Sequence, residues 1–218
     1  MSKPVPNPEK HIHASIKIAL QGLAFWISYR QVLYYEHSIH EATLVSKFLD
    51  LLRGKLNNSL AICNESQYEK GKKRTDVEIR EKTVEKDNGS KEKCKGKKLA
   101  VIEFKRNQAS MKDIKNDIEK LIEVKRNEGI PCYLVVTSDK KPPKIFEVMK
   151  KKAPKIFEAM KENAPKKNLS DIKFSLKKEI KKYAKFNNFK STGYLYSKKG
   201  NIQKANYCSL LEIKRKIK

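Results

Sequence analysis

Two apolar runs separated by an amphipathic stretch constrain the fold of this chain most. The first run is LAVIEF, residues 99–104, and the second is CYLVVT, residues 132–137. Between them, residues 108–127 carry apolar side chains at steps of three and four, which predicts a helix that ends at Gly129. A helical crossover of about 20 residues joins neighbouring parallel strands. The sequence therefore predicts a strand–helix–strand unit and an α/β fold.

Four further elements are predicted upstream of this unit. Apolar periodicity predicts one helix from about His13 to Tyr35 and another from Ser38 to about Lys55. The period then changes, and residues 59–68 and 74–84 are predicted strands. We interpret the proline-rich residues 1–9 as a loose tail.

The C-terminal third contains a repeat with a period of 11 residues. PKIFEVMKKKA (143–153) is followed by PKIFEAMKENA (154–164), and each copy predicts a proline-started helical turn with lysines on one side. The repeat suits either a basic arm on DNA or a short helical insertion with a solvated face. Beyond it, residues 169–186 predict an amphipathic helix and residues 192–213 predict a hairpin.

The chain is strongly basic, with 50 Lys+Arg against 25 Asp+Glu and a formal net charge of +25. Residues 141–218 hold 23 Lys/Arg and 6 Asp/Glu, a net charge of +17. Such an excess indicates a polyanionic partner, with nucleic acid as the first candidate. Lysine-rich coding alone gives a similar excess, so charge does not decide the function. Within this basic region, Lys181, Lys182 and Lys185 are candidate nucleic-acid-binding residues.

Several function classes are disfavoured by missing patterns. The four cysteines form no CxxC pair, which argues against a zinc site. There is no Walker-type phosphate loop, so ATP use is not indicated. The apolar stretch at residues 18–27 is shorter than the ~20 residues that a membrane span needs. We therefore expect no membrane partner and, without a signal-like segment, a cytoplasmic location. His11 and His13, beside the tail, are interpreted as incidental.

Two charged side chains end the strand at residues 99–105. Because side chains two apart on a strand share a face, Glu103 and Lys105 lie side by side next to a core. That placement is costly unless a metal ion or an anionic substrate accompanies them. Asp76 lies on the preceding strand, so its carboxylate can approach that of Glu103.

This set of groups suits metal-dependent phosphodiester chemistry. The carboxylates of Asp76 and Glu103, with the carbonyl of Phe104, are hard oxygen ligands of the kind that Mg²⁺ prefers. The ion would polarise a phosphodiester oxygen and lower the pKa of an attacking water. Lys105 would position or deprotonate that water and offset the charge of the transition state.

Plainer interpretations of the same residues remain open. Glu103 and Lys105 can form an ion pair at the sheet edge, with Asp76 as a turn residue. Glu78 either faces the site beside Asp76 or, as we favour, pairs with a lysine of the 91–98 loop.

Asp76 followed by Glu103-x-Lys105 resembles the motif of the PD-(D/E)xK nuclease superfamily, which includes type II restriction endonucleases. The resemblance covers about residues 38–138 and implies a restriction endonuclease-like α-β-β-β-α-β core with a mixed sheet. The predicted elements follow this order. Thr75 stands where the motif has its leading proline, a departure that is common in so divergent a family. The resemblance implies a Mg²⁺-dependent endonuclease that cuts DNA, with Mn²⁺ as a substitute ion, and a restriction-type defence role.

The resemblance also implies further site residues. A glutamate on the first core helix often joins the metal site of the family, and Glu41 is the better-placed candidate here, with Glu36 in reserve. A capping cluster of His37, His40 and Glu41 is the alternative for this segment. Gln108, three residues after Lys105, is either a helix cap or a substrate contact.

We expect three parts: an N-terminal tail and helix (1–37), a nuclease core (38–138) and a basic helical and hairpin region (139–218). The apolar N-terminal helix is a candidate homodimer face. A structure-specific resolvase or repair nuclease is a second enzyme hypothesis. Sequence-specific cutting would need base contacts, for which the candidates are Asn187, Asn188, Gln203 and Asn206.

A non-catalytic nucleic-acid-binding protein is the rival hypothesis. Such a protein would stack bases of a single strand on aromatic side chains. The candidates are Phe186, Phe189, Tyr194, Tyr196 and Tyr207.

Overall fold

A six-stranded mixed sheet organises the chain, as the computed structural model shows for residues 7–33, 39–64, 75–82, 96–106, 109–139, 145–148, 174–195 and 202–214. The helices are α1 (Pro8–Leu33), α2 (Glu41–Arg53), α3 (Met111–Glu128) and the short α4 (Lys178–Lys181). The strands of the sheet are β1 (Leu60–Asn64), β2 (Val77–Glu81), β3 (Lys98–Arg106), β4 (Cys132–Asp139), β7 (Ala184–Leu195) and β8 (Ile202–Ile213). A separate pair is formed by β5 (Phe146–Val148) and β6 (Phe174–Leu176).

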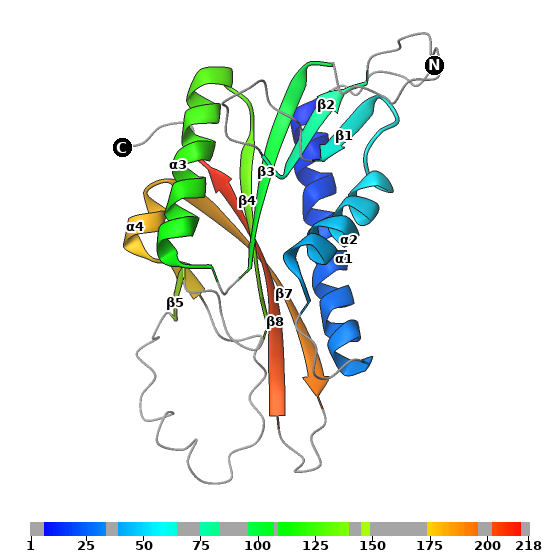
Figure 1. Cartoon of the computed structure of the whole chain (residues 1–218), viewed down its shortest axis with the longest axis vertical. Helices are drawn as coiled ribbons and strands as arrows, with labels where there is room; N and C mark the ends of the chain where they lie inside the picture. Colours follow the sequence, from blue (N-terminus) through cyan, green and yellow to red (C-terminus); the bar gives the residue numbers. More distant parts are fainter. Residues whose placement is uncertain are drawn as a thin grey trace.

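The strand order in the sheet is β1-β2-β3-β4-β8-β7 (Figure 1). The first three strands are antiparallel neighbours, and β3 and β4 run parallel. The helix α3 connects β3 to β4, which confirms the predicted strand–helix–strand unit. Strand β8 then pairs antiparallel with β4, and β7 pairs antiparallel with β8 at the edge of the sheet. The fold is therefore mixed α/β.

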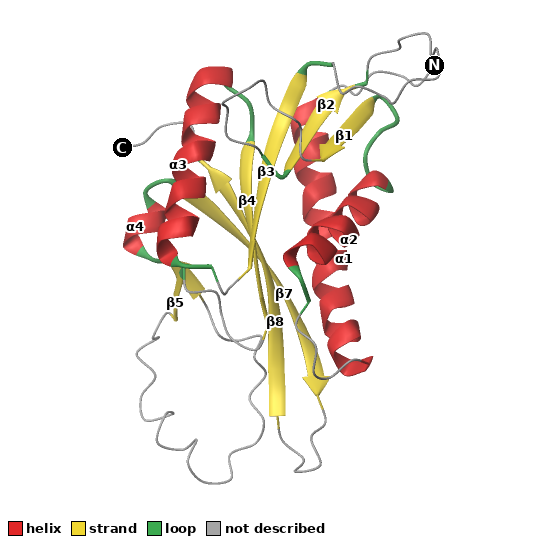
Figure 2. Ribbon diagram, viewed as in Figure 1, coloured by secondary structure: helices red, strands yellow, loops and turns green. Residues whose placement is uncertain are grey.

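Helices cover both faces of the sheet. The helices α1 and α2 lie on one face and α3 lies on the other (Figure 2). Alternation along β3 divides its side chains between the two cores: Ile102 and Phe104 pack with α1 and α2, and Val101 packs with α3. The same alternation directs Glu103 and Lys105 toward the face that α3 covers.

Both ends of α3 follow from local sequence signals. Ser110 and Asp113 form a reciprocal capping box at the start. Gly129 ends the helix in the left-handed conformation with φ 70°. Buried Ile114, Ile118 and Leu121 face the sheet, as the periodicity predicted.

The helix α1 begins earlier than predicted, at Pro8. The side chain of Asn7 accepts a hydrogen bond from Lys10 N at 3.1 Å, and proline suits the first helical position. The placement of His11 and His13 beside a tail is therefore wrong, because both lie in α1 and make structural contacts. His11 Nε2 accepts a hydrogen bond from Asn57 N at 3.1 Å, and His13 Nδ1 lies 3.3 Å from the hydroxyl of Tyr133.

The predicted C-terminal hairpin is confirmed and is longer than expected. The strands β7 and β8 pair along all 12 residues of each, so that pairing begins at Ala184. The amphipathic helix predicted at residues 169–186 is wrong, because the described part, residues 174–186, holds β6, the four-residue α4 and the start of β7.

The 11-residue repeat also departs from its prediction where it is described. The residues Phe146–Val148 of the first copy form β5 and pair with β6, so they are not a helical turn. The remainder of the repeat, residues 143–144 and 149–164, lies outside the described residues. Among the described helices, none is long and apolar enough to cross a membrane.

Candidate active site

The candidate site forms where β3 extends beyond β2. Pairing of the two strands ends at Val77, opposite Ile102, so the next part of β3 has no strand partner on that side. The carboxylates of Asp76 and Glu41 accept hydrogen bonds from its backbone N–H groups instead. Phe104 N donates to Asp76 Oδ2 at 2.7 Å, and Arg106 N donates to Glu41 Oε2 at 3.1 Å. Asp76 and Glu41 are thereby fixed along one edge of β3.

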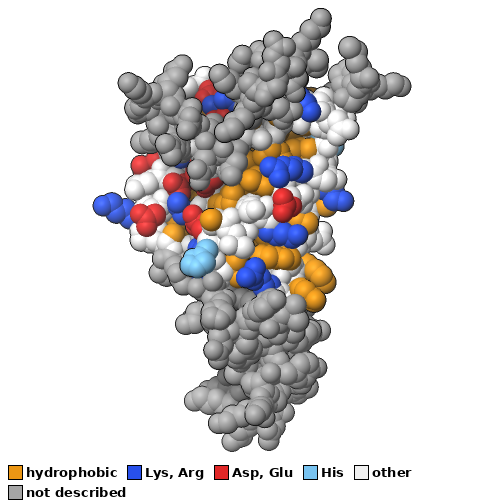
Figure 3. All heavy atoms as spheres, turned by 45° about the vertical axis from the view of Figure 1, so that its right-hand side comes forward, with side chains coloured by type: hydrophobic (Ala, Val, Ile, Leu, Met, Phe, Trp, Pro, Cys, Tyr) orange, Lys and Arg blue, Asp and Glu red, His pale blue; other side chains and the backbone are white. Residues whose placement is uncertain are grey.

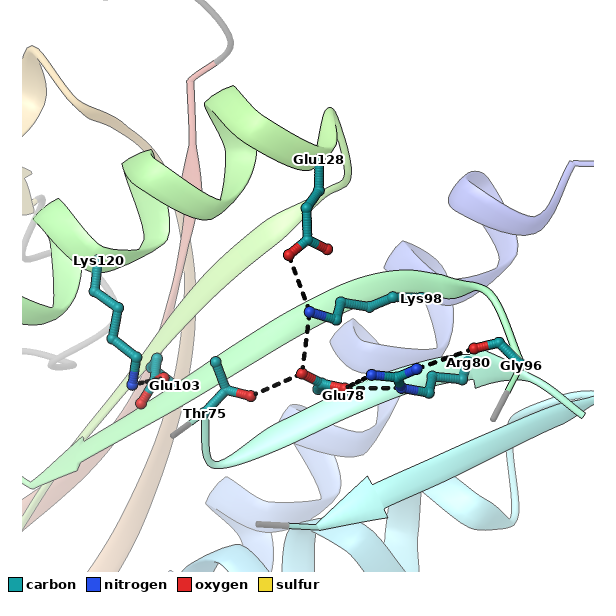
Figure 4. Close-up of polar contacts among 8 residues, drawn as sticks. All are labelled: Thr75, Glu78, Arg80, Gly96, Lys98, Glu103, Lys120 and Glu128. Carbon is teal, nitrogen blue, oxygen red and sulfur yellow. Dashed lines mark hydrogen bonds and ion pairs between the residues drawn. The ribbon is translucent and has the colours of Figure 1, made fainter. Parts of the chain in front are cut away.

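Glu103 is buried on the face of β3 that α3 covers. The residue is 2% exposed, and its Oε1 lies 2.5 Å from Lys120 Nζ (Figure 4). Burial, together with the charges of Asp76 and Asp117, raises the pKa of Glu103 to about 8, although Lys120 acts in the opposite direction.

Lys105 forms the second ion pair with α3. Its Nζ lies 3.2 Å from Asp117 Oδ2. Burial acts to lower the pKa of Lys105, but Asp117, Glu41 and Asp76 more than offset burial, so that the pKa is raised. The lysine is therefore a cation at neutral pH. For Asp117 burial dominates and raises the pKa, although Lys105 opposes it.

Asp117 and Lys120 are site residues that the sequence interpretation missed. They lie three residues apart on α3, beside the buried stripe of Ile114, Ile118 and Leu121. Charged side chains that border a buried helical stripe are a usable signal, because they end close to the sheet that the stripe covers.

Glu78 belongs to a different cluster, as predicted. It is 1% exposed and forms ion pairs with Arg80 at 2.6 Å and with Lys98 at 3.3 Å (Figure 4). Thr75 Oγ1 donates to it at 3.3 Å, and Lys98 also reaches Glu128 at 3.0 Å. Burial alone would raise the pKa of Glu78, but Arg80 and Lys98 together lower it. The prediction that Glu78 pairs with a lysine of the 91–98 loop is confirmed.

Some of the groups at the site are of the kind that bind divalent cations. The carboxylates of Asp76 and Glu103 are hard ligands next to one strand. However, Asp76 already accepts a backbone hydrogen bond and Glu103 is paired with Lys120. Within the described residues, no group of three His, Cys, Asp or Glu side chains is arranged to hold a metal ion. The residues thus offer the carboxylates of Asp76 and Glu103 at neighbouring positions along β3, with Lys120 beside Glu103.

Other predicted residues are distributed more widely. Glu36, His37 and Gln108 lie outside the described residues. His40 is the N-cap residue of α2, but its side chain makes no capping hydrogen bond, which weakens the predicted capping cluster. Exposed lysines occur in and after α4, where they are Lys181, Lys182 and Lys185.

The predicted stacking and base-reading residues are only partly described. Tyr207 is 4% exposed and Phe186 packs against the core under α3, so these two rings are not free platforms for bases. The side chains of the other candidates lie outside what the structure describes.

Four carboxylates and two lysines thus lie along the last part of β3 and the facing side of α3: Glu41, Asp76, Glu103 and Asp117, with Lys105 and Lys120. Comparisons of this chain with protein-family models, with curated proteins and with solved structures gave no significant match.

Proposed function

We propose that this protein is a Mg²⁺-dependent endonuclease that hydrolyses DNA phosphodiester bonds. One observation carries the proposal: Asp76 and Glu41 accept hydrogen bonds from the backbone of Phe104 and Arg106, on the strand that carries Glu103 and Lys105. Asp76, Glu41, Glu103 and Lys105 are the residues that the resemblance to PD-(D/E)xK nucleases singled out. The element order from α2 through β1, β2, β3 and α3 to β4 agrees with the order expected for such a core.

Each residue has a distinct role in this proposal. Asp76 and Glu103, with the Phe104 carbonyl, would hold Mg²⁺ or Mn²⁺, which polarises the phosphodiester and lowers the pKa of a bound water. Asp76 and Glu41 are oriented by their backbone hydrogen bonds. Lys105, whose pKa is raised, acts as a cation that stabilises the negative charge of the transition state, rather than as a base.

The test is cleavage of supercoiled plasmid by the purified full chain with Mg²⁺, with Mn²⁺ and with EDTA. We expect metal-dependent nicking or linearisation that is lost in Lys105→Ala and Glu103→Ala, with DNA binding retained. The matched controls are Lys115→Ala and Glu119→Ala, which remove the same groups from exposed positions of α3 and should cut normally. Equal cutting by Lys105→Ala and wild type would overturn the assignment.

A non-catalytic nucleic-acid-binding protein is the second candidate, and one observation favours it. Glu103 and Lys105 each have an ion-pair partner on α3, which also suits a purely structural network. Binding of DNA and RNA without cleavage under any of the three metal conditions would support this candidate. Branched DNA in the same assay separates a structure-specific nuclease from a restriction-type enzyme.

A further inference from the structure

A hydrogen bond between two buried side chains spans the position of Asp76. Thr75 Oγ1 donates to Glu78 Oε1 at 3.3 Å, and the chain bends at Asp76 between them. On a straight strand, side chains three residues apart point to opposite faces, about 10 Å apart along the chain. The turn of the backbone at Asp76 brings the two side chains together, and their hydrogen bond in turn holds the bend. We call the bonded pair of Thr75 and Glu78 the clamp.

Both oxygens of the Glu78 carboxylate are held in place. Arg80 contacts Oε2 through Nε at 2.8 Å and through Nη2 at 2.6 Å, and its Nη1 donates to the carbonyl of Gly96 at 3.1 Å (Figure 4). Lys98 Nζ lies 3.3 Å from Oε1 and 3.0 Å from the carboxylate of Glu128, the last residue of α3. The acceptor of the clamp is thereby tied to β2, β3 and α3.

Glu78 is a charged side chain in the interior of the protein. Charged side chains are usually at the surface, as Figure 3 shows for lysines, arginines and acidic residues on the side of α1 and α2. Glu78 and Thr75 are each only 1% exposed. Because apolar side chains of similar volume often replace a buried ion pair without loss of stability, stability alone does not account for this carboxylate. An apolar side chain at position 78 could not accept a hydrogen bond from Thr75.

Asp76, inside the clamp, makes a directed contact with β3. Its Oδ2 accepts a hydrogen bond from Phe104 N at 2.7 Å. Pairing of β2 with β3 has ended at this position, so the carboxylate takes the place of a strand partner. The direction of the Asp76 side chain therefore depends on the bend that the clamp spans.

We propose that Thr75 and Glu78 are positioning residues: the clamp fixes the bend at Asp76 and so directs this carboxylate to the edge of β3, where it would bind the metal ion. The inference rests on the proposed function, because that function makes Asp76 a metal ligand. Outer hydrogen bonds of this kind keep ligand side chains in place, and their loss typically costs about 10–100-fold in metal affinity.

Exchange of the Phe104 amide hydrogen, followed by NMR on the full chain, reports the position of Asp76 directly. Thr75→Val removes the hydroxyl and keeps the shape of the side chain. We expect the Phe104 amide to exchange roughly fivefold or more faster in this variant, and at the wild-type rate in Thr75→Ser. The Arg106 amide, which donates to Glu41 Oε2, is the internal control and should keep its rate.

Binding of Mn²⁺ to the full chain without DNA, measured by titration calorimetry, is the second readout. We expect a dissociation constant roughly tenfold or more weaker for Thr75→Val, with recovery in Thr75→Ser. Thr137→Val removes a hydroxyl from another buried threonine, in β4, and should bind Mn²⁺ as wild type does.

The two measurements separate this inference from the nuclease proposal. Faster exchange at Phe104 alone, in a protein that binds no Mn²⁺, would support the clamp and overturn the nuclease proposal. Mn²⁺ binding and Phe104 exchange that Thr75→Val both leaves unchanged would overturn the clamp and leave the nuclease proposal standing. Equal acceleration at Phe104 and Arg106 would also overturn the clamp, because it would mean a general loss of stability.

Discussion

Two buried glutamates show how the same side chain acquires opposite properties. Glu78 faces two cations, Arg80 and Lys98, and its pKa is lowered despite burial. Glu103 pairs with Lys120, but its burial and the negative charges of Asp76 and Asp117 outweigh that cation, so its pKa is raised. The first pattern is that of a structural ion-pair cluster. The second is typical of functional sites, where like charges are held together at a cost in stability.

Replacing Glu103 with glutamine should remove the free-energy cost of ionising a buried carboxyl group, a cost that depends on pH. The folded pKa of about 8 lies above the ordinary value of 4.5, so between these values the folded state holds a proton that the unfolded state releases. Wild-type stability should therefore fall relative to Glu103→Gln as pH rises from about 5 to 8, at most by about 4 kcal/mol. Urea unfolding in EDTA at several pH values measures this difference. Glu119→Gln, at an exposed position of α3, should show no such trend.

Replacing Glu78 should have the opposite pH dependence. Because its folded pKa is lowered, its stabilising effect is present above about pH 4.5 and is lost as pH falls through the folded pKa. Glu78→Gln leaves Arg80 and Lys98 without their shared carboxylate, so it should cost roughly 2–4 kcal/mol at pH 7 and less at pH 3. The same urea series tests this. A cost that grew toward low pH would contradict the assigned ion pairs.

At this scale the sequence predicted part of the site. Asp76, Glu103 and Lys105 could be grouped because alternation and strand order place them together. The partners on α3 could not, because the rotation of a helix about its axis over a sheet depends on how its whole apolar face packs. Asp117 and Lys120 border that face, which marks them as candidates, but the pattern alone does not separate site-facing charges from solvated ones.

At the scale of the element, the close approach of β2 and β3 depends on Gly96. Glu81 N donates to Lys97 O at 2.9 Å, and the pairing shifts register between Ile79 and Arg80. A Cβ at Gly96 would lie 1.7 Å from the carbonyl oxygen of Glu81, which is backbone and cannot rotate away.

Gly96→Ala should therefore destabilise the protein by about 2 kcal/mol or more, because the backbone must move. Gly54→Ala is the control. Gly54 has φ −69°, and a Cβ added there would lie 3.8 Å from its nearest neighbour, the carbonyl oxygen of Leu51. Alanine should therefore be neutral or slightly stabilising at this position. Urea unfolding of both variants compares them, and equal stability of Gly96→Ala and wild type would contradict the close approach.

The elements that the sequence predicted well are those whose local signals all indicate the same structure. The unit β3–α3–β4 has apolar strands, a capping box and a terminal glycine, and all of these agree. Residues 169–186 contain a lysine-rich pattern that fits a helical period, but most of the stretch beyond α4 is paired in β7. Extension of the hairpin with β8 back to Ala184 overrode the helical pattern there.

At the scale of the whole molecule, charge and chemistry occupy different parts of the chain. The candidate site is built from residues 41–120, where acidic and basic side chains are paired. The strongest positive excess belongs to residues 141–218. If the protein binds nucleic acid, cations outside the site should supply much of the affinity, and this affinity should depend on salt.

Substitution of Lys181, Lys182 and Lys185 by glutamine tests this division. Each phosphate contact contributes about 0.9 to the slope of log affinity against log salt, so the slope for duplex DNA should decrease by up to ~3. The matched control replaces three exposed cations of α3, Lys112, Lys115 and Arg126, and has the same net charge. If only the first triple variant loses affinity and slope, the phosphate-binding surface lies at α4 and β7. Equal losses in both would mean that binding follows total charge rather than a defined surface.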